Sequence, residues 1–236
     1  MGHSLGGLIA RMVAHKLMLH KFKLRHYVSI ATPHLGSRFK SVIPPEAAAV
    51  VARQTGKDLF LMDGKDPLVA ALAHTPFLET LAAFESRTAY GCVQYDMSVG
   101  FETSLIRVDN PYLERFSTQR ITQPFQALMN SMPVAYSFNF TSVSSSQPRL
   151  KDVSTPTGDM SSLLDSNSDV HVQQMLERLN SLTWTKIAIF PTRPLYGHVD
   201  VIVRDERWNL QFGHSVIQHI VDRVLGIPAN AQLVVK

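Results

Sequence analysis

Apolar residues recur at the spacing of an amphipathic helix in several segments of the chain. The clearest segment is 170–182, where one predicted helix face carries Val172, Met175, Leu176, Leu179 and Leu182. The same spacing predicts helices over 5–21, 45–54, 66–84 and 215–225. Because proline removes a helical N–H group and clashes with the preceding turn, Pro76 should divide 66–84 into two pieces.

Short apolar runs alternate with these helices and predict strands. They cover residues 26–31, 87–95, 184–190 and 199–203. Strands that alternate with helices are typical of a parallel sheet, because each helix makes the crossover to the next strand. We therefore expect an α/β fold with a mainly parallel sheet and helices on both faces. Residues 137–168 are rich in Ser, Thr, Pro and Asp and are expected to form a flexible insertion.

Composition narrows the class of protein. A length of 236 residues with 45% apolar residues fits one globular domain. No apolar run approaches the roughly 20 residues that are needed to span a bilayer. The single cysteine, Cys92, excludes an internal disulfide and favours an intracellular location, in the cytoplasm or at the periphery of a membrane. The net charge of +4 is modest, and its scattered distribution argues against nucleic acid as a partner.

Basic residues gather in one place, at 16–25, near the predicted end of the first helix. This cluster contains Lys16, Lys21, Lys23 and Arg25. Cations suit the C-terminal end of a helix dipole, so we interpret the cluster as a solvated helix end. The alternative is a peripheral contact with the headgroups of an anionic membrane.

The first seven residues, Met1-Gly2-His3-Ser4-Leu5-Gly6-Gly7, carry the strongest chemical signal. The pattern G-x-S-x-G before a helix is typical of a nucleophile elbow, in which the serine sits on a tight strand-to-helix turn. Gly2 and Gly6 are expected to keep side chains away from the crowded turn. The Leu5 amide, at the helix N-terminus, is the expected donor of an oxyanion hole.

A second motif, Ala31-Thr32-Pro33-His34-Leu35-Gly36-Ser37, follows the predicted strand at 26–31. Together the two motifs resemble the lipase-like serine esterases, a eukaryotic branch of the α/β-hydrolase superfamily. The resemblance continues through 53–61, 84–87, 95–99 and 103–107, weakens over 110–180, and returns near 197–198 and 216–219. It implies the α/β-hydrolase fold and the hydrolysis of lipid-like esters.

The position of the elbow in the chain leads to a further expectation. In an α/β-hydrolase, central strands and the loop that carries the second oxyanion donor normally precede the elbow. Here only Met1 precedes Gly2. We therefore expect residues 1–236 to be the C-terminal portion of such a domain.

The resemblance also orders the remaining catalytic residues, since an acid and then a histidine follow the serine. Asp96 is the leading acid, because it follows the predicted strand at 87–95 and the segment 96–99 matches the family's acidic position. Its role would be to hold the histidine in one tautomer and to stabilise the imidazolium. The alternative is an aspartate that caps the turn after a strand. Asp109 and Asp63 are the reserve candidates.

The base must be chosen among ten histidines. It should follow the last core strand, at 184–190, and His198 lies there in a stretch that the resemblance supports. His214 is a weaker candidate, because the N-terminus of the closing helix disfavours its charged form. His219 is expected opposite the apolar stripe of that helix, in a surface or structural role. His34 is interpreted as a hydrogen-bonded loop organiser, with lining of the active site as the alternative.

Neither a metal nor another cofactor is expected. His15 and His20, like His214 and His219, are five residues apart, which is not the spacing of a helical zinc site. The apolar segment 77–84, with 59–62 upstream, fits either a core helix or a cap over an acyl-binding groove.

These residues predict a serine esterase or lipase that cleaves carboxylic esters through an acyl-enzyme, with Ser4, Asp96 and His198 as its triad. Transfer of the acyl group to an acceptor other than water stays open, because the acyl-enzyme is common to both reactions. The alternative is a catalytically incomplete part of such a hydrolase, without the N-terminal strands and the oxyanion loop.

Overall fold

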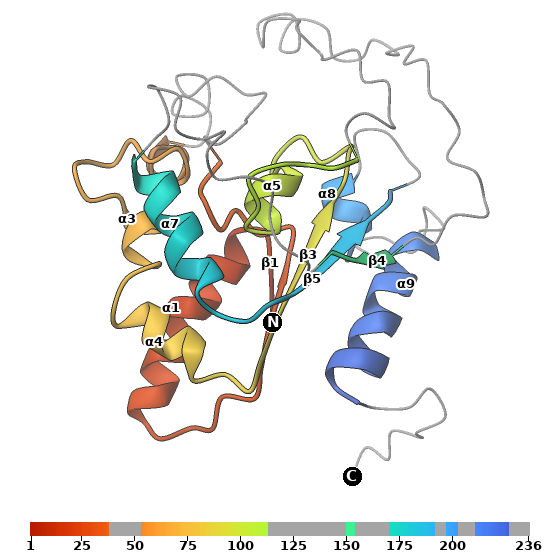
Figure 1. The fold of residues 1–236 in the computed structure, drawn as a ribbon, viewed down its shortest axis with the longest axis horizontal. Coiled ribbons are helices and arrows are strands. Elements are labelled where there is room, and N and C mark those ends of the chain that lie inside the picture. The colour runs from red at the N-terminus through yellow and green to blue at the C-terminus, as the bar shows by residue number, and fades with distance from the viewer. Residues whose placement is uncertain (38–52, 113–149, 154–169, 192–196, 203–210, 227–236) are drawn as a thin grey trace, which may run out of the picture.

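In the part of the chain that the structure describes, five strands form one central sheet (Figure 1). The computed structural model describes residues 1–37, 53–112, 150–153, 170–191, 197–202 and 211–226. Across the sheet the strands are β1 (Gly2–His3), β2 (His26–Ile30), β3 (Ser86–Cys92), β5 (Thr185–Ile189) and β4 (Leu150–Asp152). The first four are parallel, and β4 runs antiparallel to β5. This arrangement confirms the predicted α/β fold with a mainly parallel sheet.

Different helices cover the two faces of the sheet (Figure 1). One face carries α1 (Leu5–Leu19), α3 (Leu68–Ala71), α4 (Phe77–Ala82), α5 (Phe101–Ser104) and α7 (Val170–Asn180). The other face carries α8 (Gly197–Asp200) and α9 (Gln211–His219), which continues into the π-helical turn η3 (Ile220–Val224). Successive side chains of a strand point to opposite faces. Accordingly, Tyr27 of β2 packs in the first core cluster, and its neighbour Val28 packs in the second.

The predicted helices form largely where the apolar spacing places them. α7 buries Val172, Met175, Leu176 and Leu179. The predicted break at Pro76 separates α3 from α4. Residues 53–59 are helical, and the rest of the predicted helix at 45–54 lies outside the described residues.

The predicted strand at 199–203 is wrong, because α8 begins at Gly197 and a turn follows at 201–202. The physical reason is the pattern of burial. Gly197, Asp200 and Val201 are buried, and their spacing of three and four residues is that of a helix. A short valine-rich run can bury its apolar side chains as a strand or as a helical turn. Here it forms a helical turn that packs beside the sheet.

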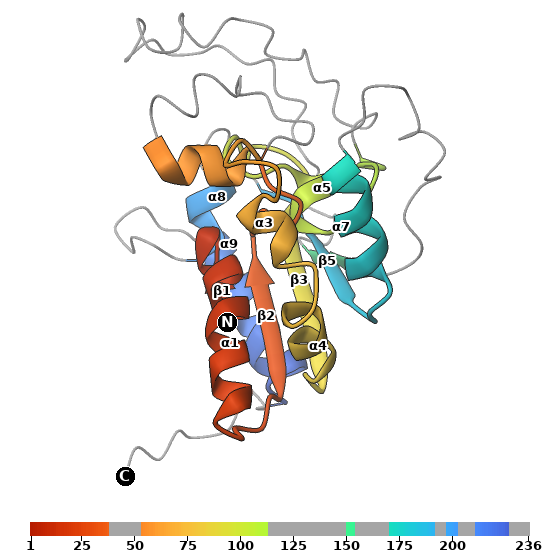
Figure 2. The same ribbon diagram turned by 90° about the vertical axis from the view of Figure 1, so that its left-hand side faces the viewer.

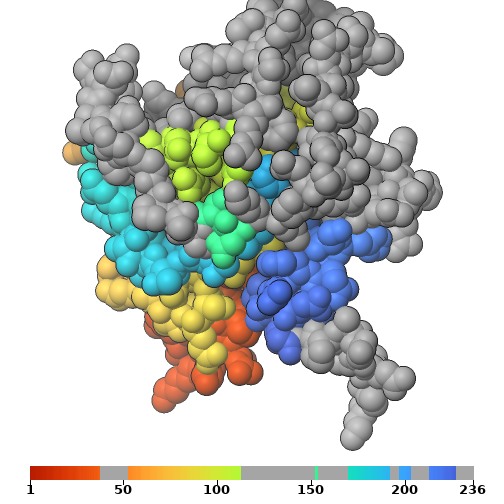
Figure 3. All heavy atoms as spheres, turned by 45° about the vertical axis from the view of Figure 1, so that its right-hand side comes forward, coloured from red at the N-terminus to blue at the C-terminus, as the bar shows by residue number. Residues whose placement is uncertain are grey.

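Strand β4 was not predicted, because it falls within the segment 137–168. Most of that segment lies outside the described residues, so its interpretation as an insertion stays a prediction. Residues 150–152 pair with β5, with Leu150 opposite Ile189 and Asp152 opposite Ile187. Figure 3 shows β4 in green at the surface, beside the yellow-green segment around α5.

The parallel topology brings the carboxyl ends of four strands to one edge of the sheet. Ser4 follows β1, and the loop with His34 follows β2. The segment with Asp96 follows β3, and the chain toward α8 follows β5. Ligands and catalytic residues of open α/β sheets gather at this edge. Among the described residues, no helix is long and apolar enough to cross a membrane.

Candidate active site

Ser4 occupies a sharp bend between β1 and α1. Its backbone angles are φ 54° and ψ −133°, and its amide donates to the carbonyl of Ile30 at 2.9 Å. A positive φ is rare in residues other than glycine and costs on the order of 1–3 kcal/mol. The surrounding structure therefore holds Ser4 in a strained conformation, as the geometry of a nucleophile elbow requires.

The glycines around Ser4 do not all have the expected role. A Cβ atom on Gly2 would overlap the carbonyl group of Gly6, and one on Gly7 would overlap the side chain of Thr32. A Cβ atom on Gly6 would meet no atom within 4 Å. The expectation for Gly2 is therefore confirmed, but that for Gly6 is wrong. Gly6 takes part in the close approach to Gly2 through its backbone carbonyl. The second position at which a side chain would not fit is Gly7.

Asp96 and His198 are in direct contact. The Nδ1 atom of His198 and the Oδ2 atom of Asp96 are 2.8 Å apart. The other carboxylate oxygen, Oδ1, accepts hydrogen bonds from the amides of Ser98 at 3.0 Å and Val99 at 2.8 Å. Asp96 thus caps the following turn and also contacts the histidine, while its role as the catalytic acid stays a prediction. Both carboxylate oxygens are engaged, which fixes the orientation of the group.

The contact with Asp96 selects the tautomer of His198. An ionised carboxylate has no hydrogen to donate and can only accept hydrogen bonds. Nδ1 of His198 therefore carries the proton and donates a hydrogen bond to Asp96. In the neutral ring, Nε2 is then the atom with a lone pair, and this is the tautomer that a general base needs. The Asp96 side chain is 1% exposed and that of His198 is 17% exposed, so the pair lies largely out of solvent.

His3 links the elbow to the segment that carries His198, a role that the sequence did not reveal. Its Nε2 atom donates to the backbone carbonyl of His198 at 2.7 Å, and the two rings lie 4.6 Å apart. Burial lowers the pKa of His3, and the nearby His198 lowers it further. Because His3 immediately precedes Ser4, this contact fixes the backbone of His198 beside the elbow.

Gly197 allows α8 to approach the segment with Asp96. Its amide donates to the carbonyl of Tyr95 at 3.2 Å. A Cβ atom at this position would lie 2.9 Å from both the carbonyl carbon and the oxygen of Tyr95. Any larger residue at position 197 would therefore push His198 away from Asp96. The sequence offered no signal for this role beyond the glycine itself.

The other two histidine candidates lie in different surroundings. His214 is exposed on α9. His219 faces the sheet, where its Nδ1 atom lies 2.8 Å from the hydroxyl oxygen of Tyr90. The expected structural role of His219 agrees with this contact, but its expected position opposite the apolar stripe is wrong. Burial lowers the pKa of His219, with a further contribution from Arg223.

His34 is fully buried and organises the loop after β2. The guanidinium of Arg11, on α1, donates from Nη2 to Nδ1 of His34. Because Nδ1 accepts, Nε2 carries the proton and donates to the Ser29 hydroxyl at 2.8 Å. The ring of Trp184 packs against His34 at 5.5 Å. These contacts agree with the interpretation of His34 as a loop organiser.

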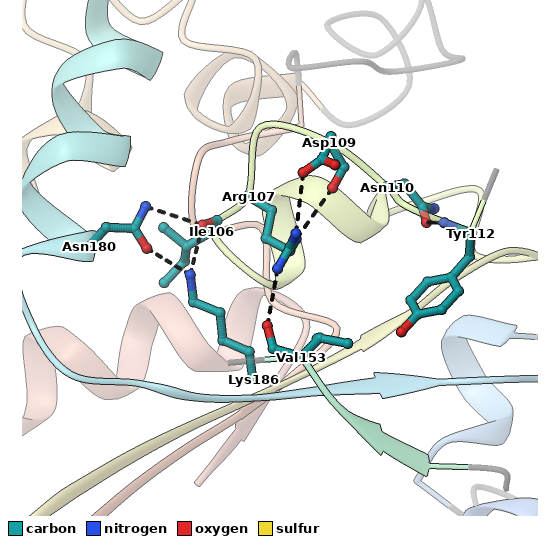
Figure 4. A network of polar contacts seen from close by, with 8 residues as sticks. All are labelled: Ile106, Arg107, Asp109, Asn110, Tyr112, Val153, Asn180 and Lys186. Carbon is teal, nitrogen blue, oxygen red and sulfur yellow. Dashed lines mark hydrogen bonds and ion pairs between the residues drawn. The ribbon is translucent and has the colours of Figure 1, made fainter. Parts of the chain in front are cut away.

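A polar network holds the segment that follows α5 (Figure 4). Ile106 has a positive φ of 52°, and its carbonyl oxygen accepts from Lys186 at 3.0 Å and from Asn180 at 3.2 Å. Lys186 also donates to Asn180 at 2.7 Å. Burial, followed by the charge of Arg107, lowers the pKa of Lys186 to about 8. The network ties this segment to β5 and to α7.

The reserve acids have other partners. Asp109 lies 3.3 Å from Arg107, which also donates to the carbonyl of Val153 at 3.0 Å (Figure 4). Asp63 accepts a hydrogen bond at 2.8 Å from the amide of Leu68, at the start of α3.

The apolar segment 77–84 is part of the core. Leu81 is fully buried, and the rings of Phe77 and His15 lie 5.4 Å apart where α4 packs on α1. α4 also leads into the first residue of β3, at the opposite end of that strand from Asp96. A cap over the site is therefore excluded for this segment.

No group of three or more metal-ligating side chains occurs among the residues that the structure describes. Leu5 is the first residue of α1, so its amide has no acceptor within the helix, and its role as the oxyanion donor stays a prediction.

Comparison with known families agrees with this geometry. An α/β sheet with a serine on a strained strand-to-helix bend is typical of the serine hydrolases. Residues 1–107 match the family model described as "Putative serine esterase (DUF676)". The match confirms the resemblance to serine esterases over this part of the chain, which contains Ser4 and Asp96 but not His198. Comparisons with curated proteins and with solved structures gave no match.

The two glycines of the motif should respond differently to substitution. Gly2→Ala should lower the free energy of unfolding by about 1–3 kcal/mol or more, because its methyl group overlaps the Gly6 carbonyl. Gly6→Ala should raise it by up to ~1 kcal/mol, because alanine favours the helix and its methyl group meets open space. Urea unfolding of the two variants measures the difference. An equal loss in both would contradict the tight approach at Gly2.

Acid should destabilise the protein through His34. Burial, and then the charges of Arg11 and Lys186, hold its pKa well below the usual value. In the unfolded chain the pKa returns to about 6.5, so the unfolded state binds more protons in the window below that pH. The free energy of unfolding should therefore fall as the pH drops below about 6.5, by up to ~1.4 kcal/mol per pH unit.

Urea unfolding at about pH 7 and about pH 5 measures this dependence. His34→Gln should flatten it, although the variant starts from a lower stability. His214→Gln, at an exposed position, is the matched control and should keep the wild-type slope. The assignment to His34 fails if the slope of His34→Gln equals that of the wild type.

Proposed function

We propose that this protein hydrolyses carboxylic esters of lipid-like substrates through Ser4, His198 and Asp96. Nε2 of His198 takes the proton from the Ser4 hydroxyl while Oγ forms a bond to the ester carbonyl carbon. The tetrahedral intermediate collapses, and the leaving alcohol receives that proton from His198. A water molecule then attacks the acyl-enzyme with His198 again as base, and the acid is released as Ser4 regains its proton.

The observation that carries the proposal is the contact of 2.8 Å between His198 and Asp96 next to the elbow. It pairs an oriented imidazole with a buried carboxylate at the edge where Ser4 is presented. As the imidazole gains a proton, the negative charge of Asp96 stabilises it. The hydrogen bond from His3 to the His198 carbonyl supports a location beside Ser4.

The Leu5 amide is the proposed donor to the developing oxyanion. It lies at the N-terminus of α1, where the helix dipole and an N–H group without a helical acceptor both favour negative charge. One such donor contributes on the order of 10²–10³ in kcat in serine hydrolases. The lipid-like character of the substrate rests on the family resemblance. An alcohol in place of water would convert the same acyl-enzyme into a transferase intermediate.

Covalent labelling tests the nucleophile. A fluorophosphonate probe should modify the protein at Ser4, because an activated serine hydroxyl attacks phosphorus as it attacks a carbonyl carbon. Ser4→Ala should abolish the labelling. Ser181→Ala, which removes an exposed hydroxyl from the end of α7, is the matched control and should label fully. Labelling of Ser4→Ala at the wild-type level, or no labelling of the wild type, would refute Ser4 as the nucleophile.

Kinetics of a short-chain p-nitrophenyl ester separate the histidines. His198→Gln should lower kcat by about 10²–10⁴, the usual contribution of a general base. His219→Gln should lower the thermal stability through the lost packing on Tyr90 and leave kcat within about threefold. His214→Gln should change neither quantity. A kcat near the wild-type value in His198→Gln, or a loss as large in His219→Gln, would overturn the assignment.

A further inference from the structure

Helix α1 has apolar side chains on both its buried and its exposed sides. The side that faces the sheet buries Gly7, Leu8, Arg11 and Ala14. The opposite side exposes Leu5, Ile9, Met12, Val13 and Leu17, which we call the outer stripe. Ile9 and Val13 are 49% and 48% exposed, values far above those of a core residue. A helix that packs on only one side normally presents polar residues to water, so this face is suited to a partner.

Positive charge continues the outer stripe. Lys16 lies on the same helical face as the outer stripe, between Val13 and Leu17, and is exposed. Lys21 and Phe22 follow the end of α1, and the Phe22 side chain is 62% exposed. Within the described part of the chain, neither Lys16 nor Lys21 has a carboxylate partner. Lys23 and Arg25, by contrast, pair with Glu85 at 3.0 Å and 3.6 Å.

The sequence lacks the negative charges that would offset these lysines locally. No Asp or Glu occurs before Glu46. α1 lies on the side of the molecule that faces the viewer in Figure 2, beside the edge of the sheet formed by β1. The outer stripe and its cations therefore form one continuous patch on α1.

We propose that the outer stripe, with Lys16 and Lys21, binds the surface of an anionic lipid membrane. The apolar side chains would enter the boundary between headgroups and acyl chains, while the lysines contact the phosphates and carboxylates of the headgroups. An exposed apolar helix face alone would fit any apolar partner. The one-sided positive charge at its end selects an anionic surface.

The stripe begins at Leu5, directly after Ser4, so a membrane on this face would adjoin the candidate active site. The inference goes beyond the proposed ester hydrolysis and does not depend on it. Binding to lipid needs no working nucleophile, and hydrolysis of a small soluble ester needs no membrane.

Vesicle flotation with the full 236-residue chain tests the proposal. The probes are vesicles of phosphatidylcholine alone and vesicles in which roughly one third of the lipid is phosphatidylserine. The protein should float with the anionic vesicles more than with the neutral ones, and salt should weaken the binding. The Ser4→Ala variant should float like the wild type, which separates this result from that of the labelling experiment.

Two pairs of variants locate the surface. The double substitution Ile9→Ser and Val13→Ser should weaken binding about tenfold or more, because it removes apolar area from the stripe. The control is Val170→Ser, on α7, where the native side chain is 60% exposed. Lys16→Gln with Lys21→Gln should weaken binding about fivefold per charge removed. Its control, Lys57→Gln with Lys65→Gln, removes the same charge from exposed positions elsewhere.

The proposal is overturned if the stripe variants float like their controls, or if the wild type binds neither kind of vesicle. It is also overturned if the wild type forms a dimer in analytical ultracentrifugation that Ile9→Ser with Val13→Ser dissociates while flotation stays unchanged. In that case the face binds a second copy of the chain. The substituted side chains are half exposed, so the variants should unfold at nearly the wild-type temperature, which circular dichroism checks.

Discussion

The bend at Ser4 is the constraint on which the arrangement of the site depends. A chain that leaves a parallel strand and enters a helix within one residue needs a backbone conformation that L side chains rarely adopt. Here Ser4 takes that conformation, with φ 54°, and the amide bond to the Ile30 carbonyl holds it in the sheet. The strain is tolerated because Gly2 and Gly7 leave room for the Gly6 carbonyl and for the Thr32 side chain. The backbone conformation of Ser4 thus depends on packing at residues before and after it in the chain.

The parallel topology brings together residues that are far apart in the sequence. Asp96 and His198 are separated by 102 residues, yet they are neighbours because the segments after β3 and β5 leave the sheet at the same edge. Short-range contacts refine this coarse placement. The close approach of Gly197 to Tyr95 holds α8 against the segment after β3, and the hydrogen bond from His3 to the His198 carbonyl holds it against β1. The network around Lys186 and Ile106 anchors the segment that follows α5.

Patterns in the sequence predict helices with one apolar stripe and strands that are buried on both faces. They fail where a strand and a helical turn would bury the same residues. β2, β3, β5 and α7 follow from their apolar runs and spacing. The run at 199–203 fits a strand or a helical turn equally well, and its described residues form a helix and a turn with the burial pattern of a helix. β4 has no signal of its own, because its pairing with β5 defines it. Likewise, Asp96 could be chosen from its position after a strand, whereas the role of His3 depends on a partner 195 residues away.

Electrostatics separates the histidines more clearly than position does. Burial lowers the pKa of His34, His219 and His3. A neighbouring group lowers each pKa further: Arg11 for His34, Arg223 for His219 and the His198 imidazole for His3. The lowered pKa favours the neutral form of each of these rings, which then act as hydrogen-bonding groups. His198 contacts a carboxylate instead, so a proton gained on Nε2 is balanced by a negative charge at 2.8 Å. Of these four imidazoles, His198 is the one that contacts a carboxylate directly in the described part of the chain, and this is the charge that the proposed base needs.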